Sequence, residues 1–267
     1  MIGNITLGQF FPGHSILHRL DPRTKILAVL LFISGIFMAE SYLAYGVIAL
    51  FAVVCIIISS IPAKLIARSL KPLWIIIIFT LAIHVFTTPG EVIYAYSFLT
   101  ITWEGIWQGL LMTARLVFLI VISSLLTFTT SPIVLTDGIE RLLNPFRRFG
   151  LPAHELAMMM TIALRFIPTL LEETDRIMKA QISRGAEFSS GNLLKRAQSM
   201  IPLLVPLFIS AFRRADELAT AMEARCYRGG ESRTRMKELR FAARDGVAFL
   251  IVCLLLVLLG VMRWVSI

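Results

Sequence analysis

Charged residues are scarce in this chain. Only 16% of its 267 residues are Asp, Glu, Lys or Arg, whereas about a quarter are charged in soluble domains. Hydrophobic residues make up 57%, and the mean hydropathy is +0.79. This balance excludes an ordinary soluble fold and predicts an all-α, polytopic membrane protein. The net charge of +9 is therefore interpreted through the distribution of Lys and Arg in membrane loops, and nucleic acid is not an expected partner.

Cysteine is also rare, since Cys55, Cys226 and Cys253 are the three in the chain and none forms a CxxC pair. Neither a disulfide framework nor a metal site is predicted. The phosphate-binding pattern Gly-x-x-x-x-Gly-Lys is absent, so ATP chemistry would belong to another polypeptide. The spans hold no set of ionisable residues marking an ion path, because Arg115 is expected near the start of a span, where it can reach the interface. We expect no cofactor and no catalytic residue.

Apolar stretches of about the length of a bilayer crossing predict five transmembrane helices. Twenty helical residues span about 30 Å, the thickness of the hydrocarbon core. The predicted spans are Ile26 to Ala39, Tyr42 to Ile61, Leu73 to Phe86, Gly109 to Thr130 and Gly246 to Met262. A cleaved signal peptide is the alternative for the first, but Met38-Ala39-Glu40 is a poor cleavage site. The pair Gly105 and Gly109 lies at the edge of a span and is interpreted as ending a loop.

The distribution of Lys and Arg predicts the orientation. Residues 131 to 244 hold 18 of the 26 Lys and Arg, whereas Pro72 to Ala114 has none. Because cytoplasmic loops collect Lys and Arg, we expect the N-terminus in the cytoplasm and the C-terminus outside the cell membrane. The chain is therefore divided into an N-terminal lead with transmembrane helices 1 to 4 (1–131), cytoplasmic coupling helices (132–243) and a C-terminal transmembrane helix (244–267).

Three helical patterns fill the cytoplasmic segment. Ile133 to Phe149 is amphipathic and is expected to lie on the membrane surface. Two long rods follow, from Ala153 to Ser183 and from about Asn192 to Arg228, and a stripe of alanines on the second predicts that they cross. An arginine stands near the end of each rod, in Ser183-Arg184-Gly185 and in Ala224-Arg225-Cys226.

Several short segments, in this order and spacing, resemble the transmembrane T component (EcfT/CbiQ-like family) of energy-coupling factor (ECF) transporters. They are Leu20 to Lys25, Ala163 to Pro168, Gln181 to Gly185, Arg213 to Leu218 and Ala221 to Arg225. The resemblance covers nearly the whole chain.

The resemblance implies a membrane coupling subunit of an ATP-driven vitamin importer. In that family two cytoplasmic helices cross, and each ends in an Ala-Arg-Gly motif that docks on one of two ABC-type ATPase subunits. Arg184 and Arg225 would be these arginines, whereas Ser183 replaces the alanine of the first motif and Cys226 the glycine of the second. A separate substrate-binding membrane subunit, possibly one of several interchangeable ones, would contact the apolar faces of the rods. The contact residues implied are Met159, Leu164, Leu203, Leu207 and Phe208.

Other interpretations stay open at this point. The chain could be the equivalent subunit of a cobalt or nickel importer, which shares the architecture. Glu172 and Glu173 also resemble the paired glutamates of an intramembrane hydrolase, and His14-x-x-x-His18 has the spacing of metal ligands. Arg184 and Arg225 could simply complement the dipoles of the helices that they end.

Overall fold

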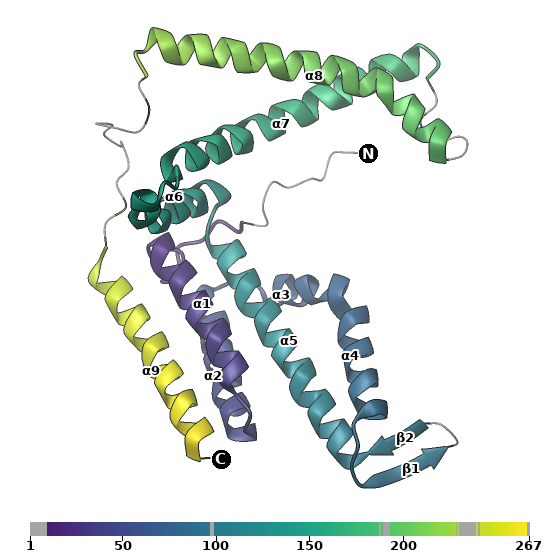
Figure 1. Ribbon diagram of the computed structural model, residues 1–267, viewed down its shortest axis with the longest axis vertical. Coiled ribbons are helices and arrows are strands. Elements are labelled where there is room, and N and C mark those ends of the chain that lie inside the picture. Colours follow the sequence, from purple (N-terminus) through teal and green to yellow (C-terminus); the bar gives the residue numbers. More distant parts are fainter. Residues whose placement is uncertain are drawn as a thin grey trace. The chain divides into compact units, whose positions relative to one another are not determined.

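The computed structural model describes residues 10–96, 99–186, 188, 193–227, 229, 239 and 241–265. These residues are mostly helical, with one short β-hairpin (Figure 1). The elements are α1 (Pro22–Met38), α2 (Tyr42–Ser59), α3 (Ala63–Leu70), η1 (Lys71–Leu73), α4 (Trp74–Thr87), β1 (Val92–Tyr96), β2 (Leu99–Thr102), α5 (Trp103–Thr129), α6 (Pro132–Leu143), η2 (Asn144–Phe149), α7 (Ala153–Ser183), α8 (Leu193–Ala224) and α9 (Ala243–Val265).

The chain forms two compact units. The first unit comprises Gly8–Gly138 and Glu238–Ile267, and the described helices of the second unit come from Ile139–Lys237. The described part of the second unit is thus inserted between two parts of the first: the chain leaves the first unit within α6 and returns to it shortly before α9.

Five helical stretches of the described chain are long and apolar enough to cross a membrane. They are α2, the continuous stretch from α3 to α4, α5, α7 and α9. The prediction of an all-helical membrane protein with about five spans is therefore confirmed, although the set differs by one helix. The predicted span α1 is not in this set, because its 17 residues are slightly too few to cross the membrane. In its place is α7, whose 31 residues are long enough to cross despite the charges in its second half.

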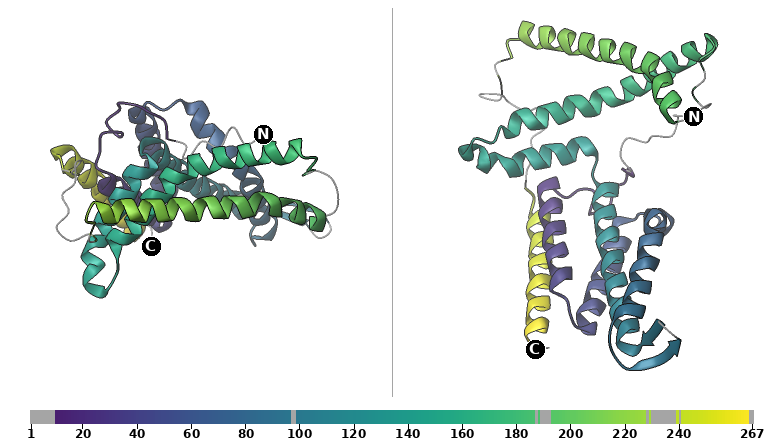
Figure 2. Two further views of the ribbon diagram at one scale, coloured as in Figure 1. Left: turned by 90° about the horizontal axis from the view of Figure 1, so that it is seen from above. Right: turned by 45° about the vertical axis from the view of Figure 1, so that its right-hand side comes forward.

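The core of the first unit lies between α1, α2, α5 and α9. Its fully buried side chains are aliphatic, and they include Ile36, Ile48, Leu125 and Leu259. Gly35 lets α1 and α9 approach closely, because a Cβ at this position would lie 3.1 Å from Leu259. Figures 1 and 2 both show α1 and α9 side by side.

Two expectations for α5 are wrong. The helix begins at Trp103, six residues before the predicted span, because the Thr102 side chain caps it by accepting the Gly105 N–H at 3.1 Å. Gly105 and Gly109 therefore lie inside the helix instead of ending a loop. A Cβ on Gly105 would lie 2.9 Å from the His84 carbonyl oxygen, so this pair lets α4 pack directly against α5.

Arg115 is also placed differently from the expectation. It lies near the middle of α5, where its guanidinium donates to the Tyr45 hydroxyl at 3.1 Å and to the Ala39 carbonyl at 3.1 Å. The α1–α2 turn is thereby fixed against α5, because Ala39 immediately follows α1. Near the same turn, Glu40 pairs with Arg263 of α9 at 2.8 Å.

The connections between the long helices contain a helix, a β-hairpin and a 3₁₀ helix that the sequence pattern did not predict. The basic segment after α2 is the amphipathic helix α3, and the segment before α5 contains the antiparallel hairpin β1–β2, whose β-branched and aromatic composition suits strands. The predicted helix Ile133 to Phe149 is divided into α6 and the 3₁₀ helix η2 near Pro145, which cannot continue an α-helix without losing a backbone hydrogen bond.

The second unit is dominated by α7 and α8, which cross and contact each other (Figures 1 and 2). α7 has the predicted bounds, Ala153 to Ser183. α8 ends at Ala224, four residues before the predicted end at Arg228. The crossed pair expected from the sequence is therefore present, with a shorter second helix.

Candidate docking site

The two crossed helices end in the same backbone motif. At the end of α7 the Gly185 N–H donates to the Ile182 carbonyl at 2.9 Å, and the Ala186 N–H donates to the Gln181 carbonyl at 3.0 Å. Gly185 has φ +86, the left-handed conformation that ends a helix and that glycine adopts without strain. Arg184 is the capping residue and its side chain is exposed.

The end of α8 repeats this pattern bond for bond. The Cys226 N–H donates to the Glu223 carbonyl at 2.8 Å, and the Tyr227 N–H donates to the Met222 carbonyl at 3.0 Å. Cys226 has φ +55, so it is left-handed although it carries a Cβ. Arg225 holds the place that Arg184 holds on α7, and it is equally exposed. Cys226 therefore forms the same turn at the end of α8 that Gly185 forms at the end of α7.

The structure places the six residues expected to dock in two separate exposed triplets. Ser183, Arg184 and Gly185 are exposed at the end of α7, and Ala224, Arg225 and Cys226 are exposed at the end of α8. Ser183 is the last residue of α7 and donates its hydroxyl to the Lys179 carbonyl at 3.1 Å.

A partly buried ion pair joins α7 and α8. The Arg214 guanidinium donates to the Glu173 carboxylate at 2.8 Å, and the exposed fractions of the two side chains are 34% and 25%. Because the partners lie 41 residues apart in the chain, this contact fixes the relative position of two helices. Glu173 is therefore engaged across the crossing, whereas the neighbouring Glu172 is exposed.

A series of polar side-chain contacts connects the end of α8 with two other elements of the same unit. The Tyr227 hydroxyl lies 3.4 Å from His154 Nε2, and His154 Nδ1 lies 3.0 Å from Glu140 Oε1. Tyr227 follows the turn at Cys226, His154 begins α7, and Glu140 belongs to α6. This link was missed from the sequence, because its partners are far apart along the chain.

The residues expected to contact a substrate-binding subunit differ in exposure. Met159 and Phe208 are 56% and 62% exposed, Leu164 and Leu207 are half-buried, and Leu203 is only 4% exposed. Leu203 is therefore a packing residue of the fold, and the available apolar surface is formed by the others.

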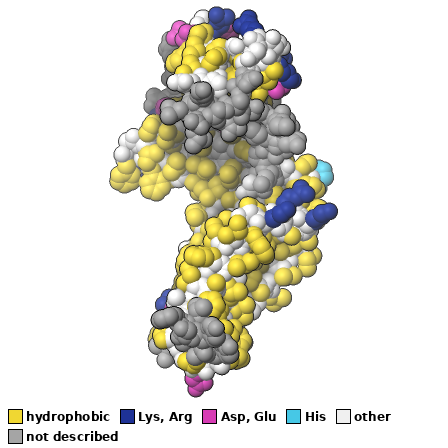
Figure 3. Space-filling view, turned by 90° about the vertical axis from the view of Figure 1, so that its right-hand side faces the viewer, with side chains coloured by type: hydrophobic (Ala, Val, Ile, Leu, Met, Phe, Trp, Pro, Cys, Tyr) yellow, Lys and Arg dark blue, Asp and Glu magenta, His cyan; other side chains and the backbone are white. Residues whose placement is uncertain are grey.

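Apolar surface is also extensive in the first unit. No residue of α4 is buried, and its tryptophan, isoleucines and phenylalanines are largely exposed, as suits a helix surrounded by lipid. Figure 3 shows such a hydrophobic face, which is interrupted by separate groups of Lys and Arg side chains.

The alternative sites are not assembled in the described chain. His18 contacts the Ser15 hydroxyl at 2.6 Å and the Phe11 carbonyl at 2.9 Å, and these bonds stabilise the lead before α1. Among the described residues, no three His, Cys, Asp or Glu side chains lie close enough to hold a metal ion.

Comparison with known proteins shows the family to which the chain belongs. The profile of the family described as CbiQ, cobalt transport protein, matches residues 13–236. The energy-coupling factor transporter transmembrane protein EcfT of Acidaminococcus fermentans is 63% identical over 264 residues, covering 99% of this chain and 98% of the relative. The EcfT proteins of Thermosediminibacter oceani and Bacillus subtilis are 60% and 45% identical over 253 and 264 residues, covering 95% and 98% of this chain and 96% and 100% of the relatives. The chain therefore belongs to the CbiQ family, among the transmembrane components of energy-coupling factor transporters.

Proposed function

We propose that this chain is the membrane coupling subunit of an ATP-driven ECF importer of vitamins. ATP is hydrolysed by two separate ABC-type ATPase subunits, and the substrate is bound by a separate membrane subunit. The observation that carries this proposal is the pair of matching helix ends, each with an exposed arginine next to a left-handed turn.

The two arginines are the contacts with the ATPases. A guanidinium presents a planar set of donors that fits a carboxylate bidentately, and it stays charged when a partner covers it. Arg184 and Arg225 are available for this contact because each lies at a helix end with its side chain exposed. A purely local role in complementing the helix dipole does not require two ends with the same backbone geometry.

Motion of the ATPases is transmitted through the crossed helices. Because Glu173 and Arg214 join α7 to α8, a displacement of either end moves both helices. The substrate-binding subunit lies against the apolar faces around Met159 and Phe208, supported by the half-buried Leu164 and Leu207 and from beneath by Leu203. Methionine and aliphatic side chains can repack against several partners.

In this proposal α7 lies on the cytoplasmic side, although its length would allow it to cross the bilayer. Its second half carries charges whose insertion would be costly, namely Glu172, Glu173, Asp175, Arg176 and Lys179. The N-terminus is cytoplasmic and the C-terminus is outside, as the distribution of Lys and Arg favours.

A second candidate is an importer of cobalt or nickel. The matching family is described as a cobalt transport protein, and this description supports a metal cargo. The names of the similar EcfT proteins specify no substrate. In either case the cargo is determined by the substrate-binding subunit.

Affinity purification of the subunit from its native membranes tests the proposal. Mass spectrometry of the purified material is expected to find two ATPase subunits and at least one small membrane protein. A subunit that purifies without any ATPase would contradict the proposal, and bound cargo in the complex would distinguish a vitamin importer from a metal importer.

A further inference from the structure

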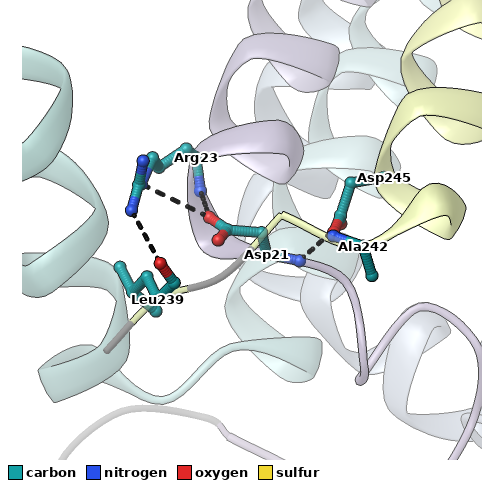
Figure 4. Close-up of polar contacts among 5 residues, drawn as sticks. All are labelled: Asp21, Arg23, Leu239, Ala242 and Asp245. Carbon is teal, nitrogen blue, oxygen red and sulfur yellow. Dashed lines mark hydrogen bonds and ion pairs between the residues drawn. The ribbon is translucent and has the colours of Figure 1, made fainter. Parts of the chain in front are cut away.

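The turn that begins α1 is tied to the start of α9 by the buried carboxylate of Asp245 (Figure 4). The Asp21 N–H donates to Asp245 Oδ1 at 2.7 Å, and the other oxygen of Asp245 accepts the Ala242 N–H at 2.8 Å. Asp21 also caps its own helix by accepting the Arg23 N–H at 2.9 Å. Asp21 and Asp245 are 6% and 3% exposed. Breaking such bonds leaves buried polar groups without partners, so this tie is strong.

Arg23 holds the segment that leads into α9. Its guanidinium donates to the Leu239 carbonyl at 3.3 Å and lies 4.9 Å from the centre of the Phe241 ring. Figure 4 shows Asp21 between Arg23 and Asp245, with Leu239 beside Arg23 and Ala242 beside Asp245.

Pro22 lies directly against α6. A Cβ added to Gly138 would be 2.9 Å from Pro22 Cβ and 3.4 Å from Ile26 Cδ1, closer to Pro22 than packed side chains approach. Only glycine therefore permits this contact without a shift of α6. Pro22 and Gly138 are both buried.

These contacts coincide with two places where the chain passes between the two units, at Gly138 and at Glu238. Gly138 is the last residue of the first unit before the insertion, and Leu239 follows the return at Glu238. We name Asp21, Pro22 and Arg23 the anchor turn. Three consecutive residues thus contact the outgoing chain at Gly138 and the incoming chain at Leu239, Phe241 and Asp245.

We infer that the anchor turn delivers the motion of the coupling helices to the transmembrane helices. This inference rests on the proposed function, because it assumes that ATPases move α7 and α8. Two chain segments that link the second unit to the first, before Ile139 and after Lys237, are both held by one turn of α1. Its three residues are positioning residues, since they act through the segments that they hold.

Lys25, one helical turn after the cap, extends the tie to α5. Its ammonium donates to the Thr129 carbonyl at 3.0 Å and to the Thr130 hydroxyl at 3.0 Å, just after the end of that helix. A displacement of the anchor turn is therefore passed to α1, α5 and α9, and the three helices respond together.

Hydrogen exchange in the whole complex tests this inference. The complex purified with its ATPases is compared with and without a non-hydrolysable ATP analogue, and exchange is read by mass spectrometry at the helix ends and at the anchor turn. The test variants are Asp245→Asn, which loses one carboxylate acceptor, and Gly138→Ala, which separates α6 from Pro22. Gly246→Ala is the matched control, because a Cβ at this neighbouring glycine meets no atom within 4 Å.

In the unmodified complex, the nucleotide is expected to change exchange at both helix ends and at the anchor turn. In either test variant, the response at the helix ends and the rate of ATP hydrolysis persist, whereas the response at the anchor turn falls about fivefold or more because the held segments move independently. The control behaves like the unmodified complex.

Three results would overturn the inference. The anchor turn could respond undiminished in both variants, it could fail to respond in the unmodified complex although the helix ends do, or all responses could fall together as in a general loss of stability. The two variants perturb different chain connections, so one suffices if the other does not assemble. Absence of ATPases from the unmodified preparation would instead contradict the proposed function.

Discussion

Cys226 takes at the end of α8 the left-handed position that Gly185 takes at the end of α7. In both turns the following N–H reaches the carbonyl five residues earlier, from Ala186 to Gln181 and from Tyr227 to Met222, at 3.0 Å in each. The two arginines that precede these residues are thus presented by the same backbone geometry, although only one turn contains glycine.

Substitutions at the two left-handed positions are expected to show that backbone shape presents the arginines. Gly185→Ala and Cys226→Val should each weaken ATPase retention, because a left-handed residue with a Cβ costs about 1 to 2 kcal/mol and β-branched valine is the least tolerant. Since 1.4 kcal/mol is a factor of ten, a loss of about tenfold is expected in titrations of ATPase onto the purified subunit.

Two further variants at Cys226 separate the backbone from the thiol. Cys226→Gly should retain the ATPase fully, and Cys226→Ala should behave like the native residue because both have a Cβ. If alanine and glycine both abolished retention, the contribution would come from the thiol and the geometric explanation would be wrong.

Reversing the charges of the Glu173–Arg214 pair should test the crossing of α7 and α8. Glu173→Arg or Arg214→Glu alone places like charges together and is expected to lower the melting temperature of the purified subunit. The double reversal should recover most of the loss. Partly exposed pairs contribute about 0.2 to 1 kcal/mol, so the shifts will be small. Strictly additive effects of the two reversals would argue against a contact between these side chains.

The local parts of this fold could be predicted from the sequence, whereas long-range ties could not. The bounds of α7 follow from Pro152 and Gly185, which are adjacent signals for a helix start and a helix end. The end of α8 was placed too late because Cys226 gives no such signal, and the pattern continued toward Gly229. The hydrogen bond from Asp21 to Asp245 joins residues 224 positions apart, so no periodicity reveals it.

The candidate site was predictable for the same reason. Arg184 and Arg225 are next to helix ends that apolar periodicity and turn residues delimit approximately. The burial of Leu203 was not predictable, because it depends on which side of α8 the rest of the unit covers. Likewise, Gly105 and Gly109 could be assigned to helix packing only once α4 was known to lie against them.

Removing His154 should loosen the end of α8 and leave the end of α7 unchanged. His154→Ala breaks the link from Tyr227 to Glu140, so exchange of the Tyr227 amide is expected to rise roughly three- to tenfold, as for the loss of one ordinary hydrogen bond. Tyr227→Phe should give a smaller rise because its contact is long. The Ala186 amide in the same sample is the internal reference, and an equal rise there would refute a specific link.

Leu203 and Phe208 should respond oppositely to truncation. Leu203→Ala is expected to destabilise the subunit by about 2 to 5 kcal/mol, because the side chain is buried. Phe208→Ala should leave the melting temperature nearly unchanged and reduce the amount of substrate-binding subunit that co-purifies. If Phe208→Ala lowered stability as much as Leu203→Ala did, the exposed apolar face would be part of the fold and not a contact surface.

The most direct test of the central claim is ATPase retention by charge-reversed helix ends. Arg184→Glu with Arg225→Glu is compared with Arg176→Glu with Arg213→Glu, which makes the same change of charge at exposed positions on the same two helices. A covered charge pair costs about 2 to 5 kcal/mol when one partner is lost, whereas an exposed one costs little. We expect the first variant to lose both ATPases during purification and the second to retain them. Retention by the first variant, or equal loss from both, would contradict docking through Arg184 and Arg225.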